Sequence, residues 1–122
     1  MSDFTVHDDG KRVEYPTGAL RSDSSGKGRF DLISPFMLER LAKHYETGGL
    51  QKGDRNWEQG FNFSRAIDSC LRHINQYRLG MRDEDHLSAA IWQLACMIHF
   101  EEMIRLGKMT DSIDDLPKYV ET

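Results

Sequence analysis

The stretch from Asp83 to Glu102 constrains the fold most. It reads DEDHLSAAIWQLACMIHFEE, with acids and a histidine first, about five helical turns of mostly apolar residues next, and His99, Glu101 and Glu102 last. A helix that is apolar nearly all round is buried on several sides. The stretch therefore predicts the central helix of a helical core, with polar groups of a candidate site at its ends.

Two further helices are predicted on the N-terminal side of this one. Ser34 is a suitable N-cap, Pro35 suits the first helical position, and Gly48 and Gly49 are typical helix stops. The apolar spacing predicts helices over 35–47, 64–79 and about 83–106, with a loop over 50–62 that carries Trp57. A tryptophan in a polar loop packs back on the core or stacks on a bound base, and both roles stay open here.

These elements predict an all-α fold, a small bundle of three main helices with an extended N-terminal arm. Glycine, proline and serine mark residues 1–29 as the arm, residues 30–109 as the helical domain, and residues 110–122 as a tail with a short turn near 112–115. Three helices do not easily cover a helix that is apolar on so many sides. We therefore expect a homodimer or a higher homo-oligomer that completes the bundle.

Composition narrows the classes of partner. The net charge is −4 and no basic block is present, which argues against binding of duplex nucleic acid, because phosphate neutralisation needs clustered cations. We expect no membrane span and no secretory signal. Cys70 and Cys96 lie in apolar helical patterns without a C-x-x-C pair and are interpreted as buried, reduced thiols. A cytoplasmic protein is expected.

The segment RSDSSGKGRF at 21–30 superficially suggests a phosphate loop. A Walker A loop needs Gly, four residues and then Gly-Lys-Ser/Thr, whereas Arg21 stands in the first position and Gly28 follows Lys27. A P-loop nucleoside triphosphatase is therefore excluded. A flexible arm carrying Arg21, Lys27 and Arg29 could still fold over a triphosphate.

Acidic residues are candidate ligands for Mg²⁺, because facing helices can supply carboxylates at i, i+3 or i, i+4 spacing. The spacing alone is weak, since 20 acids in 122 residues give many accidental pairs. The E-E-x-x-E and E-x-x-D pattern of all-α pyrophosphohydrolases is absent. His86 and His99 are 13 positions apart, about 20 Å of helix, so they cannot share one ion. His73 would join either of them only if the second and third helices pack with those faces together.

A set of short segments carries a family resemblance. They are GALRSDSSGKGRFDLISP from Gly18, RLAKHYETGG from Arg40, GDRNWEQG from Gly53, LRHINQY from Leu71, EDHLSAAIWQ from Glu84, HFEE from His99 and DDLPKY from Asp114. Over roughly residues 17–119 the chain resembles the dATP/dGTP diphosphohydrolase N-terminal domain, which occurs in phage proteins and in enzymes that release pyrophosphate from purine deoxynucleotides. The resemblance implies an all-helical, metal-dependent hydrolase of purine (deoxy)nucleoside triphosphates in phage nucleotide metabolism.

The resemblance also implies roles for particular residues. The implied catalytic residues are Glu84, Asp85 and His86. The residues implied to bind the metal, Mg²⁺ or Mn²⁺, are Glu46, Glu84, Asp85 and Glu102. The residues implied to bind the substrate are Lys27, Arg29, Asn56, Trp57, Arg72 and His73. The chain departs from the family pattern in two places. Gln51-Lys52-Gly53 replaces Lys-Tyr-Gly, and Trp92-Gln93 replaces Trp-Asn. On this assignment, the amide variants of Glu84 and Asp85 should be inactive but folded.

Two other functions are compatible with the residues. A non-catalytic phage accessory module would bind a protein through a helical face, and its acids would serve as surface charges and helix caps. A binder of single-stranded nucleic acid would use Trp57 and the basic arm, which the negative net charge disfavours.

Overall fold

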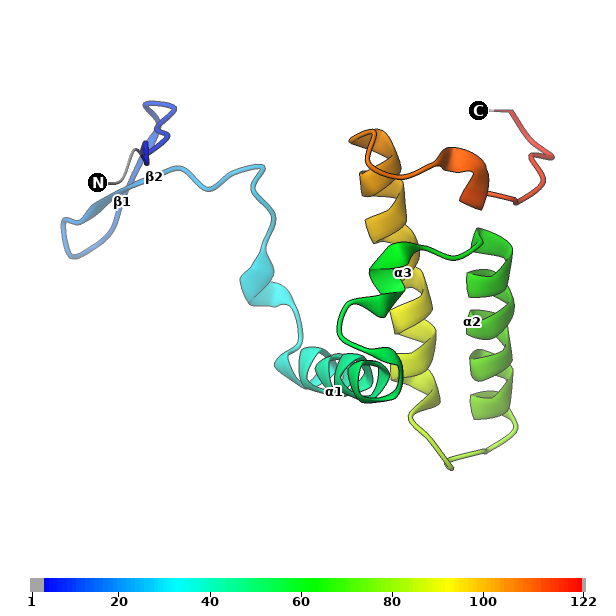
Figure 1. Cartoon of the computed structure of the whole chain (residues 1–122). Coiled ribbons are helices and arrows are strands. Elements are labelled where there is room, and N and C mark those ends of the chain that lie inside the picture. Colours follow the sequence, from blue (N-terminus) through cyan, green and yellow to red (C-terminus); the bar gives the residue numbers. More distant parts are fainter. Residues whose placement is uncertain (1–3, 122) are drawn as a thin grey trace. The chain divides into compact units, whose positions relative to one another are not determined.

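The computed structural model describes residues 4–121, shown in Figure 1. The chain divides into two compact units, Met1–Ile33 and Ser34–Thr122. Three long helices dominate the second unit, which confirms the predicted all-α class. None of the helices in the described residues is both long enough and apolar enough to cross a bilayer.

The first unit contains a short hairpin that was not predicted from the sequence. Strand β1 (Arg12–Glu14) pairs antiparallel with β2 (Leu20–Ser22), with Arg12 opposite Ser22 and Glu14 opposite Leu20. Gly18, at φ +88°, lies in the connecting turn, where that backbone region favours glycine. Both strands are exposed throughout, so they lack the alternation of buried and exposed residues by which strands are recognised. A single 3₁₀ turn, η1 (Phe30–Leu32), follows.

Helix α1 (Pro35–Lys52) begins as expected and ends later than expected. The Ser34 hydroxyl accepts a hydrogen bond from the Met37 backbone N–H at 3.2 Å, which confirms the predicted cap. The helix continues through Gly48 and Gly49, so the predicted end at Thr47 is wrong. The chain instead leaves the helix at Gly53, with φ +97°. Glycine weakens a helix by only about 1 kcal/mol, so Gly48 and Gly49 do not by themselves end it.

Helices α2 (Phe63–Arg78) and α3 (His86–Arg105) lie side by side and antiparallel (Figure 1), and α1 contacts the first half of α3. The predicted bounds of α2 differ from the observed ones by one residue at each end. Residues 83–85 precede α3 instead of forming its first turn, and Asp85 is its N-cap. The predicted loop is partly helical, because α1 extends into it and η2 (Asn56–Gln59) follows.

The core lies where α2, α3, the η2 loop and the tail meet. Its buried centre is Phe63, Cys96 and Phe100. The tail turn η3 (Asp111–Ile113) confirms a short turn there and belongs to this core. Partly buried side chains pack round the centre, among them Trp57, Phe61, Trp92, Met109, Ile113 and Leu116.

The tail also caps α2. Asp115 accepts hydrogen bonds from the Ser64 backbone N–H at 2.9 Å and from the Ser64 hydroxyl at 2.5 Å, whereas the N-cap residue Asn62 makes no side-chain cap bond. An N-terminal N–H group of α2 is thus satisfied by a residue 51 positions away.

Four apolar side chains of α3 remain exposed in the single chain. Leu87, Ile91, Leu94 and Ile98 are spaced by four, three and four positions and are 37–63% exposed. This spacing places them on one helical face. We call this face the α3 stripe. It is the surface that the predicted homodimer would cover, and the dimer itself stays a prediction.

Candidate functional site

A cleft of about 1150 Å³ opens in the second unit between the end of α1, the following loop, α2 and α3. This volume lies slightly above the usual range of ligand sites, about 300–1,000 Å³. Four of the predicted site residues line it: Glu46, Asn56, Trp57 and Arg72. These four predicted residues do meet in space, although they come from three separate elements.

The face of α2 that lines the cleft is cationic and polar. Arg65, Ser69 and Arg72 recur at intervals of four and three, which puts them on one side of the helix. Asp68 lies 3.0 Å from Arg72 and 3.7 Å from Arg65, four and three positions away on the same helix. Gln93 of α3 donates its amide N–H to the Ser69 hydroxyl at 3.1 Å and thereby joins the two helices across the cleft.

Aromatic rings form the apolar part of the cleft. Trp57 packs edge-on against Tyr45 and His99, with ring centroids 5.6 and 4.8 Å apart. Phe61 stacks on Trp92 at 5.9 Å. Trp57 therefore anchors its loop on the core and also lines the cleft, so the two roles that the sequence left open are compatible.

Two carboxylates line the end of the cleft near α1. Glu46 lies on the exposed face of α1, and Asp54 follows the helix end. A Cβ atom at Gly49 would lie 2.7 Å from the Asp54 carboxylate oxygen. The missing side chain at Gly49 thus makes room for this carboxylate.

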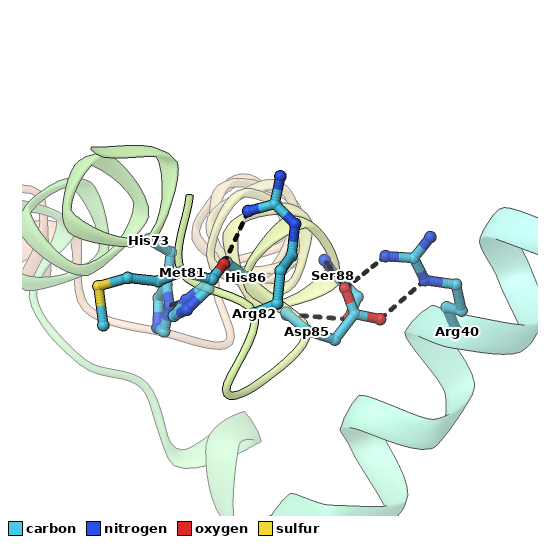
Figure 2. Close-up of polar contacts among 7 residues, drawn as sticks. All are labelled: Arg40, His73, Met81, Arg82, Asp85, His86 and Ser88. Atoms are coloured by element: carbon cyan, nitrogen blue, oxygen red, sulfur yellow. Dashed lines mark hydrogen bonds and ion pairs between the residues drawn. The ribbon is translucent and has the colours of Figure 1, made fainter. Parts of the chain in front are cut away.

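A second polar cluster joins the end of α2 to the start of α3. His73 and His86 face each other with 2.9 Å between their Nδ1 atoms, as drawn in Figure 2, and Glu84 Oε1 lies 3.8 Å from His73 Nδ1. The other nitrogen of His86, Nε2, lies 2.9 Å from the Asp83 carboxylate. The His86 side chain is only 1% exposed. Hydrogen bonding to His86 keeps the pKa of Asp83 below its usual range.

Asp85, the predicted catalytic and metal-binding residue, makes two structural contacts (Figure 2). Its two carboxylate oxygens accept hydrogen bonds from the Arg40 guanidinium at 2.6 and 2.8 Å. The same carboxylate accepts the Ser88 backbone N–H at 3.2 Å, as an N-cap. The hydrogen bonds from Arg40 chiefly, and those from Ser88, hold the pKa of Asp85 well below its usual range. The carboxylate is thus ionised and holds α1 against the start of α3.

Asp85→Ala should lower the free energy of unfolding by about 1–2 kcal/mol, because it removes an N-cap worth about 1 kcal/mol and an exposed ion pair worth at most about 1 kcal/mol. Arg40→Ala is the matched control, since it removes the ion pair and keeps the cap. Urea denaturation of both variants measures the difference. Equal losses in the two variants would mean that the cap contributes nothing.

His44 of α1 lies near both the cleft and the polar cluster of His73 and His86. It lines the cleft and packs against Trp92, with ring centroids 5.3 Å apart. Burial lowers its pKa, as does the like charge of His73 when that residue is protonated, while Asp85 and Glu84 act in the opposite direction. His44 is therefore mainly neutral at pH 7.

The structure does not bring the predicted metal ligands together. Among residues 4–121, the only close group of three or more metal-binding side chains is His73, Glu84 and His86. Glu102 pairs with Arg105 at 3.1 Å, about 25 Å along α3 from Asp85. Glu46 lies in the cleft. His99 contacts Trp57 instead of His86, in agreement with the inference that the two histidines of α3 cannot share an ion.

Lys27 and Arg29, the two arm residues assigned to the substrate, lie in the first unit. Arg29 pairs with Asp31 at 2.8 Å, and the Lys27 backbone N–H donates to the Ser24 carbonyl in a turn. Their assignment to the substrate stays a prediction, as do the catalytic assignments of Glu84, Asp85 and His86.

Several residues of the cleft were not predicted from the sequence. Arg65 could have been found, since it shares the helical face of Arg72 at i, i+7. His44 and Asp54 carry no such signal, because their place depends on how α1 crosses α3 and on the turn after α1. Arg40, the partner of Asp85 across 45 positions, was likewise out of reach of any local pattern.

Both cysteines are buried and free of disulfides, as predicted. Burial raises the pKa of the Cys96 thiol to about 12 and raises that of Cys70 as well. Both are therefore protonated at neutral pH, and neither supplies the thiolate that nucleophilic catalysis requires.

Comparison with family models gives one assignment. The model described as dATP/dGTP diphosphohydrolase, N-terminal, matches residues 17–112, which is most of the chain. The chain belongs to this family. The match spans the hairpin's second strand, all three helices and the whole cleft of this diphosphohydrolase-family domain. Comparison with curated proteins and with solved structures gave no match.

Proposed function

We propose that this chain hydrolyses purine (deoxy)nucleoside triphosphates to the nucleoside monophosphate and pyrophosphate. The observation that supports this most is the cleft, which combines guanidinium groups, aromatic rings, amides and carboxylates in one space of about 1150 Å³. The family description names the same type of substrate. A nucleotide needs guanidinium groups for its phosphates, rings and amides for its base, and carboxylates for its counter-cation.

The phosphates would lie along α2. Arg65 and Arg72 both line the cleft, and a guanidinium donates two parallel hydrogen bonds to a phosphate. Asp68 partly neutralises both arginines in the single chain, at 3.7 and 3.0 Å. A triphosphate carries more negative charge than one carboxylate and would compete for these donors.

The base would lie on the aromatic side of the cleft. Trp57, Phe61 and Trp92 present ring surfaces there, and the side-chain amides of Asn56 and Gln93 carry donors and acceptors for the base edge. The Gln93 amide N–H donates to the Ser69 hydroxyl, which fixes the orientation of the amide and leaves its oxygen free to accept a hydrogen bond from a base. The Asn56 amide oxygen accepts from Gln59 Nε2 at 3.2 Å, so both amides are oriented. Selection of a purine would therefore rest on stacking area together with these two amides.

The carboxylates at the end of the cleft fit the metal that the family implies. Mg²⁺ is commonly held by one or two carboxylates together with substrate phosphates, and Glu46 and Asp54, which both line the cleft, would supply these carboxylates. When bound, the ion would neutralise phosphate charge and lower the pKa of a nearby water. The chain's own part is to hold the phosphates against α2 and the base against the rings.

A nucleotide panel tests the proposal. Purified protein is incubated with each dNTP and NTP and Mg²⁺ or Mn²⁺, and pyrophosphate release is coupled to a pyrophosphatase. We expect release from purine triphosphates only, and none with EDTA. The absence of release from every nucleotide, with protein shown to be folded, would refute the proposal.

The α3 stripe favours a second function. An exposed apolar face of Leu87, Ile91, Leu94 and Ile98 is what a non-catalytic interaction module would present to a partner, or to a second copy of this chain. Light scattering, together with the nucleotide panel, separates these cases from the first proposal. A dimer with hydrolytic activity supports the enzyme, whereas an inactive protein that dimerises without nucleotide or metal supports the module.

A further inference from the structure

We propose that His73, Glu84 and His86 form a binding site for one divalent cation of the later first-row transition series, such as Zn²⁺ or Co²⁺. The site is separate from the carboxylates of the cleft and does not depend on the proposed hydrolysis. Its three donor atoms, two imidazole nitrogens and one carboxylate oxygen, lie within 4.8 Å of one another.

The donor set decides the class of ion. Imidazole nitrogen suits Zn²⁺, Fe²⁺, Ni²⁺ and Cu²⁺, whereas Mg²⁺ prefers an all-oxygen shell. Two histidines with one carboxylate also leave at least one coordination position open, because zinc sites have four ligands or more. The family's Mg²⁺ therefore does not fit here, and the same chain offers Mg²⁺ a carboxylate pair elsewhere, at Glu46 and Asp54.

The distance between the two histidines agrees with a shared ion. Two nitrogens at about 2.0–2.1 Å from one ion lie about 2.9 Å apart at right angles, as in a six-coordinate Co²⁺ site, and about 3.3 Å apart in a tetrahedral zinc site, so a shift of a few tenths of an ångström suits either ion. The Nδ1 atoms of His73 and His86 are 2.9 Å apart. Glu84 Oε1 lies 3.8 Å from His73 Nδ1, and its side chain is 55% exposed, so a rotation about its own bonds brings it to the ion.

The surroundings of His86 resemble the outer shell of a metal site. Asp83 accepts a hydrogen bond from His86 Nε2 at 2.9 Å, and a carboxylate only accepts, so the ring proton belongs on Nε2. The Nδ1 lone pair then points toward His73. A carboxylate on the far nitrogen fixes the tautomer and raises the basicity of a ligating histidine in many metal proteins. The His86 side chain, 1% exposed, is held in this orientation.

The connection between α2 and α3 is also fixed in shape, which presents Glu84 to the two histidines. Arg82 donates to the backbone carbonyls of Tyr77 at 3.1 Å and Met81 at 2.7 Å, and its guanidinium lies 3.8 Å from the centroid of the Tyr77 ring. Gly80, at φ +96°, makes the turn. Figure 2 shows Met81, Arg82 and the histidine pair at this end of the helices. A site built on two helix ends and a fixed connection changes little in shape on binding.

Metal titration of the full chain tests the site. Protein freed of metal by a chelator is titrated with Co²⁺, and the visible ligand-field bands are followed. We expect saturation at one equivalent, displacement of Co²⁺ by Zn²⁺, and no displacement by a large excess of Mg²⁺. Zn²⁺ should also raise the thermal midpoint, since an ion that binds only the folded state stabilises it.

Variants assign the ion to these residues. Glu84→Gln and His73→Ala should abolish saturable Co²⁺ binding. Asp83→Asn should weaken it by about 10- to 100-fold, as the loss of an outer-shell carboxylate does. Glu84 and Asp83 are exposed, so their variants test the site even if a change at the buried His86 prevents folding. His7→Ala in the first unit and Glu101→Gln on α3 are matched controls and should bind as the wild type does.

Three results would contradict the proposal. Without an ion, His73 would simply donate a hydrogen bond to His86 across the same 2.9 Å. Co²⁺ binding that is absent from the wild type, or that Glu84→Gln and His73→Ala leave unchanged, would mean that the histidines only make this hydrogen bond. Mg²⁺ that displaces Co²⁺ at equal concentration would contradict the assigned class of ion.

Discussion

Arg72→Ala should lower kcat/KM for purine triphosphates by about 10- to 100-fold. A hydrogen bond to a charged group contributes about 1.5–3 kcal/mol, and each 1.4 kcal/mol corresponds to a factor of ten. Arg72 lines the cleft and its side chain is 48% exposed, so the guanidinium can turn from Asp68 to a phosphate. Initial-rate kinetics on the best substrate of the nucleotide panel measure the change.

The matched control is Arg78→Ala. Arg78 is in the last turn of the same helix but does not line the cleft, so its loss should leave kcat/KM within about twofold. Equal effects of the two substitutions would indicate a general effect of charge and would contradict a phosphate site on α2. An Arg72→Ala protein with full activity would place the phosphates outside this cleft.

The helices were accessible from sequence because each is set by short-range rules. Ser34 and Pro35 specify the start of α1, and apolar spacing specifies α2 and α3 to within about three residues at each end. The end of α1 was not accessible. Gly48 and Gly49 match a stop signal, but Gly49 instead provides room for Asp54, a contact that depends on the following turn.

The same distinction applies to the candidate sites: contacts within one helix were accessible from the sequence, and contacts between helices were not. The i, i+3 and i, i+4 positions of one helix follow from spacing, so the contact between Asp68 and Arg72 is accessible from the sequence. Which face of α2 meets which face of α3 does not follow from spacing, and this decides that His73 lies against His86. Asp85 shows why a role cannot be assigned from sequence alone. A carboxylate just before a helix can cap the helix, pair with a cation or bind a metal. Here it caps α3 and pairs with Arg40.

The largest loss of stability is expected for Phe100→Ala. Phe100 is 0% exposed and is packed by the rings of Trp57, Phe61 and His99, with centroids 5.0–6.3 Å away. Truncating a buried phenylalanine costs about 3–5 kcal/mol, from lost transfer energy and the cavity left behind. This loss is a large part of the free energy of unfolding of a typical domain, which is about 5–15 kcal/mol. Urea denaturation followed by tryptophan fluorescence measures it, since Trp57 reports on the same core.

Ile98, two residues away on α3, is the matched comparison. It is 63% exposed, so Ile98→Ala should cost less than about 1 kcal/mol in the single chain. If Phe100→Ala does not fold, Phe100→Leu keeps most of the volume, and its loss should still exceed that of Ile98→Ala. A Phe100 variant as stable as the wild type would contradict the core described here. A loss at Ile98 that grows with protein concentration would instead identify the α3 stripe as the surface of a homodimer, because only an association equilibrium links stability to concentration.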